Sequence, residues 1–145
     1  QFQGRKKRIS PHLCRGPYEP IEQELEQFYD QLLAVLRQPV VRQGHWQLLA
    51  CAPTWDGNWT WDGFLAFAWQ GPDGERLLVA VNYAANQGQC YVPLHCPDLS
   101  GHAVRLKDLM GPASYDRDGA DLVSQGLYLD MPPWSFHVFE VLRLA

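Results

Sequence analysis

Two short apolar runs joined by a turn constrain the fold of this chain more than any other feature. The runs cover residues 64–70 (FLAFAWQ) and 76–83 (RLLVAVNY), and the five residues between them read GPDGE. Glycine, proline and aspartate favour a tight connection, and apolar runs of this length favour strands. The pattern therefore predicts two antiparallel strands in which Gln70 pairs with Arg76.

The predicted register gives this hairpin two unlike faces, because side chains alternate along a strand. The bulky face carries Leu65, Phe67, Trp69, Leu77, Val79 and Val81. The alanine-rich face carries Phe64, Ala66, Ala68, Leu78, Ala80 and Asn82. We predict that the bulky face packs across a sandwich on strands near Leu129 and Val138. A helix or another domain should lie close to the alanine-rich face.

Further apolar runs separated by turn residues follow along the chain, which has 145 residues, 46% apolar content, 12 Gly and 11 Pro. This favours a mainly β fold with one core. More strands are predicted in a hairpin at 40–49 with its turn at Gln43-Gly44, in a third strand of the same meander at 90–94, and at 102–107, 127–131 and 134–142. The predicted fold class is an antiparallel β-sandwich of about seven or eight strands with one N-terminal amphipathic helix.

The helix is predicted from apolar residues spaced three and four apart, namely Ile21, Leu25, Phe28, Leu32, Val35 and Leu36. It should begin near Pro20, end before Pro39 and be about 17 residues long. Residues 1–17 show no periodicity and are interpreted as an irregular lead-in. The predicted domains are therefore 1–38, the lead-in and helix, and 39–145, the sandwich.

Charge and cysteine content bear on partners and location. The net charge of −4 indicates neither nucleic acid nor a membrane surface. The basic run 5–8 is interpreted as a solvated strand edge, with a phosphate contact or localisation signal as the alternative. The sequence contains no run of 18 apolar residues, so no membrane span is predicted. The four cysteines lack CxxC spacing, so we predict reduced thiols, no metal site and a cytoplasmic location. Since the first residue is Gln1 rather than Met, we expect the chain to be part of a longer protein.

A segment with three tryptophans in seven residues precedes the central hairpin. Indole rings stack on the apolar faces of sugars, and neighbouring carboxylate and amide groups can bond hydroxyls. The candidate carbohydrate-binding residues are Trp55, Asp56, Asn58, Trp59 and Trp61. The alternative is that these aromatics pack over the sheet or in a domain interface. Residues 58–60 also form an Asn-Trp-Thr glycosylation pattern.

No catalytic pattern is present in the sequence. A nucleophile elbow, a phosphate-binding loop and an HExxH pair are all missing, and no cysteine lies beside a plausible base. The acidic stretch 116–121 lacks the ligand spacing of an EF-hand, so a turn at Asp118-Gly119 is predicted there instead. We therefore predict no catalytic residue, no metal and no cofactor.

Four segments resemble the C-terminal region of bacterial α-amylase-family glycoside hydrolases. They are the lead-in 1–5 (QFQGR), the helix segment 28–33 (FYDQLL), the strand 77–83 (LLVAVNY) and the ending 127–139 (LYLDMPPWSFHVF). The resemblance implies that residues 1–38 are the tail of a (β/α)8 catalytic barrel and that the rest is the β-sandwich domain that follows it. The family's two catalytic aspartates and one glutamate have no counterpart here.

The resemblance therefore implies a non-catalytic C-terminal β domain of an α-amylase-like enzyme of carbohydrate metabolism. Its expected partners are the catalytic barrel of the same parent chain and α-glucan. One alternative is a free-standing carbohydrate-binding module that uses the loop 55–61. Another is a domain that self-associates as a homo-oligomer through the helix stripe or the alanine-rich face.

Overall fold

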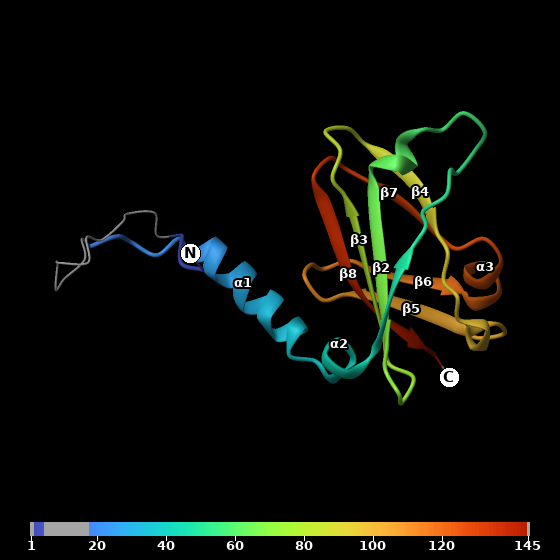
Figure 1. Cartoon of the computed structure of the whole chain (residues 1–145), viewed down its shortest axis with the longest axis horizontal. Helices are drawn as coiled ribbons and strands as arrows, with labels where there is room; N and C mark the ends of the chain where they lie inside the picture. The colour runs from blue at the N-terminus through green and yellow to red at the C-terminus, as the bar shows by residue number, and fades with distance from the viewer. Residues whose placement is uncertain (1, 5–17, 145) are drawn as a thin grey trace. The chain divides into compact units, whose positions relative to one another are not determined.

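The computed structural model describes residues 2–4 and 18–144, and Figure 1 shows its helices and strands. The chain divides into two compact units, Gln1–Arg37 and Gln38–Ala145, and each is described by itself. The basic run 5–8 lies outside the described residues. The assignment of residues 1–38 to the tail of a barrel stays a prediction.

The first unit contains the predicted amphipathic helix, α1 (Gln23–Leu36). It has 14 residues and begins later than expected, because Glu22 at the N-cap has extended backbone angles (φ −83°, ψ 95°). The backbone N–H of Glu22 donates to the carbonyl of Gln3 (3.1 Å), and the Phe2 and Tyr29 rings meet edge to face (4.9 Å). The described N-terminal residues therefore pack on the helix.

The second unit is built on a six-stranded antiparallel sheet in the order β1-β2-β3-β8-β5-β6. The strands are β1 (His45–Leu49), β2 (Phe64–Gln70), β3 (Arg76–Asn82), β5 (Ala103–Asp108), β6 (Ser114–Asp118) and β8 (Ser135–Arg143). The predicted hairpin is confirmed as β2 and β3, with Gln70 opposite Arg76. With the second sheet, the described residues form eight strands in two antiparallel sheets, which confirms the predicted fold class.

The second sheet pairs β4 (Gly88–Val92) with β7 (Leu127–Met131). The prediction that β4 continues the meander beside β3 is wrong, because β8 takes that position. β8 buries Val138 and Phe139, which point to opposite faces, and a strand apolar on both sides suits the interior of a sheet. β4 instead alternates buried and partly exposed residues, which suits an outer layer.

The core lies against the alanine-rich face, so the predicted orientation of the hairpin is wrong. Ala66 and Ala80 are buried and directly opposite each other. Their small side chains let the second sheet approach closely. The main cluster of buried residues therefore lies between this face of the six-stranded sheet and the second sheet. It includes Phe64, Ala66, Leu78, Ala80, Cys90, Val92, Leu129, Met131, Phe139 and Val141. The bulky side chains point away from this core.

Helical turns connect the strands at places where the sequence predicted turns or strands. The hairpin predicted at 40–49 is wrong in its first half, because α2 (Pro39–Gln43) occupies it with Pro39 at the first turn, where no N–H is needed. Asp118 is the N-cap of α3 (Gly119–Ser124), and its carboxylate accepts from two backbone N–H groups. Two short 3₁₀ turns are η1 (Thr60–Gly63) and η2 (Pro97–Leu99).

Candidate functional site

The tryptophan-rich loop runs from β1 to β2 at the end of the sandwich where the β3–β4 connection also lies (Figure 1). Asn58 anchors this loop from a buried position. Its Nδ2 donates to Thr54 Oγ1 (2.6 Å) and to the Gln89 carbonyl (3.2 Å). Its Oδ1 accepts from the N–H and the hydroxyl of Thr60 (2.9 and 2.7 Å). The amide is thus occupied by the fold itself, which leaves it unsuited to glycosylation or to contact with a sugar.

The other predicted carbohydrate-binding residues lie in different surroundings. Trp61 is partly buried and packs against the core, as the alternative interpretation expected for aromatics in this segment. Asp56 is exposed. Trp55 and Trp59 have exposed fractions of 56% and 80%. Only the last two rings therefore offer a large open surface to a ligand.

Trp59 forms one wall of an open groove with a volume of about 450 Å³. The groove lies between η1 and the connection that follows β3, and its lining residues are Trp59, Thr60, Asp62, Gly63, Tyr83, Ala84 and Asn86. The two walls are tied where the Tyr83 N–H donates to the Gly63 carbonyl (3.0 Å). Sequence reasoning missed Tyr83 and Asn86, because they follow β3 and reach Trp59 only through the fold.

Asn82, the last residue of β3, holds the second wall of the groove. It is fully buried, and its Nδ2 contacts the carbonyls of Asn86 (2.9 Å), Met131 (3.1 Å) and Pro132 (3.0 Å). Its Oδ1 accepts from the Ala84 N–H (3.1 Å). One side chain thereby joins the ends of β3 and β7 and fixes the turn that carries Tyr83.

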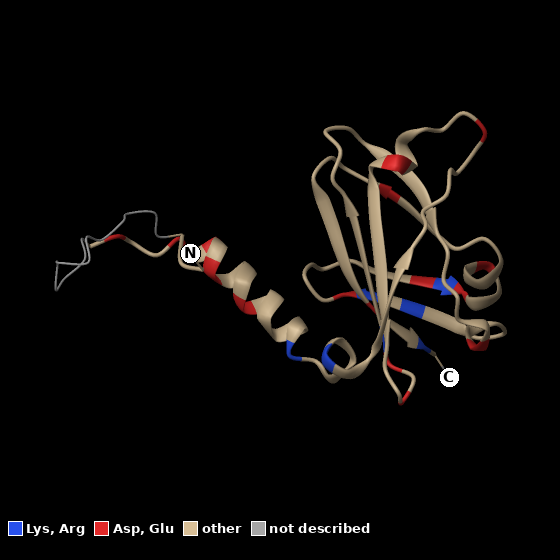
Figure 2. Ribbon diagram, viewed as in Figure 1, with Lys and Arg blue, Asp and Glu red and all other residues tan. Residues whose placement is uncertain are grey.

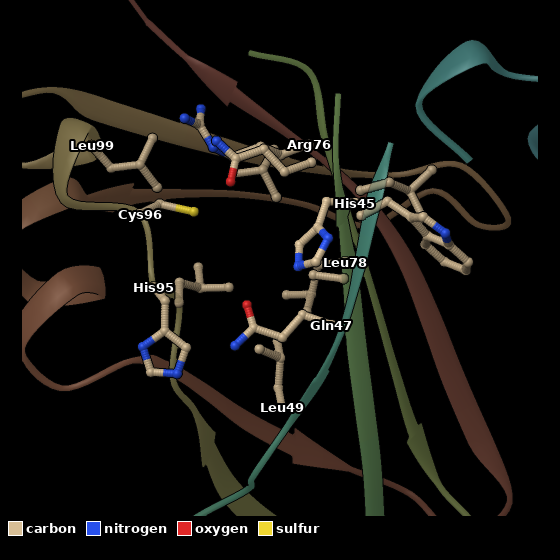
Figure 3. A pocket seen from close by; sticks show the side chains of 14 residues that line it. His45, Gln47, Leu49, Arg76, Leu78, His95, Cys96 and Leu99 are labelled. Atoms are coloured by element: carbon tan, nitrogen blue, oxygen red, sulfur yellow. The ribbon is translucent and has the colours of Figure 1, made fainter. Parts of the chain in front are cut away.

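A second cavity lies under β1, between that edge strand and the segment that precedes η2 (Figure 3). Histidine, glutamine and arginine side chains lie around an apolar floor, and burial raises the pKa of the Cys96 thiol. The cavity volume is about 40 Å³, which is room for about three water molecules. It is too small for a sugar ring, although a water there would meet Arg76 Nε, a buried donor with no partner among the described residues.

The bulky face of the hairpin extends across neighbouring strands and forms what we call the outer face. By register it contains Trp46, Leu48, Leu65, Phe67, Trp69, Leu77, Val79, Val81, Phe136, Val138 and, at its β8 edge, Glu140. Trp46, Leu48 and Leu65 have exposed fractions of 51%, 56% and 43%. Figure 2 shows β1 and β2 without charged residues. Contiguous apolar surface of this kind marks an interaction site in a folded protein.

Asp108 and His137 form the best candidate for acid–base chemistry. His137 Nδ1 lies 2.7 Å from Asp108 Oδ2. However, Asp108 Oδ1 also accepts from the N–H groups of Met110 and Val138, and the His137 ring stacks on Phe139 (4.8 Å). Among the described residues, no hydroxyl or thiol is hydrogen-bonded to His137. The pair therefore organises the turn after β5 and has no nucleophile to activate.

Within 2–4 and 18–144, no three His, Cys, Asp or Glu side chains are grouped so that they could hold a metal ion. No helix in this part of the chain is both long and apolar enough to cross a membrane.

The fold and these surfaces define a mainly β unit with an apolar outer face and an aromatic groove at one end. No model of a known protein family matches the chain, and a search of curated proteins finds no significant match. The functional conclusion therefore depends on the sequence resemblance and on the surfaces themselves.

Proposed function

We propose that the chain is the non-catalytic C-terminal β domain of an α-amylase-like glycoside hydrolase, and that its outer face packs against the catalytic barrel. The observation that carries this proposal is the exposure of Trp46, Leu48 and Leu65 on adjacent uncharged strands. A large apolar surface on the side of a sheet away from its own core needs a cover. From the sequence resemblance, we infer that the structure packed on this surface is the catalytic barrel that precedes such domains.

The same observation bears on the alternative of self-association. The alanine-rich face is buried in the core and is not available to a second copy. The outer face is available, so a chain without its barrel should associate through it. Light scattering on the isolated chain measures this, and a monomer at every concentration would remove the self-association alternative.

The first test is to sequence the complete reading frame that encodes this chain. We expect it to encode a (β/α)8 barrel before residue 1, with two catalytic aspartates and one glutamate at the ends of barrel strands. A frame without such a barrel would refute the proposal.

The second test is mutational and uses the full-length enzyme. Leu48→Asp and Leu65→Asp each place a carboxylate in the proposed interface. Each should lower the free energy of unfolding by at least about 1.5–3 kcal/mol, the value of burying one large apolar side chain. Val123→Asp is the matched control, because Val123 is 37% exposed on α3, away from the outer face. Equal effects of all three variants would contradict the proposed interface.

A further inference from the structure

The groove at the end of the sandwich combines flat aromatic surface with hydroxyl-binding groups. Trp59 and Tyr83 have exposed fractions of 80% and 59% and come from opposite walls. Asp62 offers carboxylate acceptors, while Asn86 offers its amide oxygen, since its Nδ2 donates to the Gln87 carbonyl (2.9 Å). Among the described residues, no side chain is hydrogen-bonded to the Asp62 carboxylate, so its acceptors are open to a ligand.

The charge of the groove limits the class of ligand. Asp62 is its one charged lining residue within the described part of the chain, and neither lysine nor arginine lines it. A phosphate or an acidic peptide would meet a like charge without a compensating cation. A neutral molecule with apolar ring faces and many hydroxyl groups fits both the rings and the polar groups.

Both walls are held in place before any ligand arrives. Asn58 fixes the loop that carries Trp59, through bonds to Thr54, Thr60 and the Gln89 carbonyl. Asn82 fixes the turn that carries Tyr83, through bonds to the backbone. A groove whose walls are locked by buried polar networks loses little conformational entropy on binding.

Another exposed tryptophan is attached to the groove through its backbone. The Trp134 backbone N–H donates to the carbonyl of Ala84 (3.3 Å), which is a lining residue. Trp134 is 67% exposed, and its φ of 56° lies in the left-handed region. For a bulky residue this conformation is unfavourable by about 1–2 kcal/mol. Because two thirds of this side chain is exposed, burial explains little of that cost, and strained residues cluster at binding sites.

We propose that this groove binds a neutral α-glucan chain, with glucose rings on Trp59 and Tyr83, hydroxyls on Asp62 and Asn86, and Trp134 extending the surface. The choice of α-glucan over other neutral glycans rests on the proposed function. The site differs from the one predicted from sequence, because it omits Trp55, Asp56, Asn58 and Trp61. It lies at the end of the sandwich and leaves the outer face free for the barrel.

The test is calorimetric titration of the 145-residue chain with maltoheptaose, and with cellohexaose as the β-linked comparison. We expect saturable binding of maltoheptaose and weaker binding of cellohexaose. Trp59→Ala and Tyr83→Ala should each weaken binding by about 2- to 10-fold, the range for one aromatic contact. Trp59→Phe should retain most of the affinity, because it keeps a flat ring.

Trp55→Ala is the matched control, since it removes an exposed tryptophan from the same loop without changing the groove. It should leave binding unchanged. Binding that survives both groove variants, or is lost in the Trp55 variant alone, would overturn the site. Absence of maltoheptaose binding would overturn the α-glucan assignment. Neither result bears on the barrel interface, which Leu48→Asp and Leu65→Asp test separately.

Discussion

Replacing Asn82 with aspartate should be one of the most damaging conservative changes in the sandwich. Asn82 is fully buried and donates through Nδ2 toward three carbonyls, those of Asn86, Met131 and Pro132. Aspartate has nearly the same shape but no donor when ionised, so three carbonyl oxygens would face a carboxylate. The amide–carbonyl contacts would become repulsive ones inside the protein.

The expected loss of stability follows from these contacts. A buried charge left without a partner is unfavourable by about 3–5 kcal/mol, and a domain of this kind has a free energy of unfolding of only about 5–15 kcal/mol. We therefore expect Asn82→Asp to lower the free energy of unfolding by about 3–5 kcal/mol at pH 7. Urea unfolding of the full chain, followed by tryptophan fluorescence, measures this difference.

The matched control is Asn86→Asp, the same substitution at an exposed position on the same turn. It should change the free energy of unfolding by about 0.5 kcal/mol or less.

The pH dependence of the stability of Asn82→Asp gives a second test. Burial among carbonyls raises the folded-state pKa of the introduced carboxyl group above its unfolded value of about 3.9. A raised folded pKa stabilises below the unfolded pKa and loses that contribution as the pH rises, so the deficit relative to Asn86→Asp should shrink toward pH 4. A deficit under about 1 kcal/mol at pH 7, or one independent of pH, would refute the role assigned to Asn82.

Two further predictions concern the cysteines and the strained tryptophan. A hydrogen bond between the Cys51 and Cys90 thiols lowers the pKa of Cys51 and raises the pKa of Cys90. Because the thiolate is the reactive form, iodoacetamide should modify Cys51 at lower pH and faster than Cys90. Peptide mass spectrometry across a pH series measures the two rates, and faster modification of Cys90 would contradict the assignment. Trp134→Gly should raise the free energy of unfolding by up to about 1 kcal/mol, because glycine adopts a φ of 56° without strain, while the affinity for maltoheptaose should fall. A Trp134→Gly variant that is less stable than the parent would argue against strain at this position.

The sequence was a sufficient guide to the hairpin and an insufficient one to its orientation. The pairing of Gln70 with Arg76 follows from local alternation and a short turn, and both lie within the segment 64–83. Which face is buried depends on a layer made by β4 and β7, whose pairing is distant along the chain. Because both faces of the hairpin are apolar, the pattern alone could not choose between them. The prediction took the larger side chains for the core, whereas the smaller ones allow the second sheet to pack.

The candidate site shows the same limit. Trp59 was predicted because tryptophans cluster visibly in sequence. Tyr83 stands at the end of an apolar run in the sequence, and nothing local connects it with residue 59. Asn58 was predicted to bind sugar because its side chain is polar, but the fold uses all of its hydrogen bonds. Polar residue type thus indicates a capacity for bonding, and only the three-dimensional structure shows where that capacity is used.

The two proposed surfaces are compatible because they use different parts of the same hairpin. The outer face is formed by side chains along β1, β2, β3 and β8, whereas the groove is formed by the segments that precede β2 and follow β3. A barrel packed on Leu48 and Leu65 would therefore not have to displace a glycan held at Trp59 and Tyr83. Asn82 links the groove to the core and not to the outer face, since it belongs to the buried face of β3 and also fixes the groove turn. Loss of its bonds should weaken glycan binding along with stability, whereas loss of Trp59 should weaken glycan binding alone.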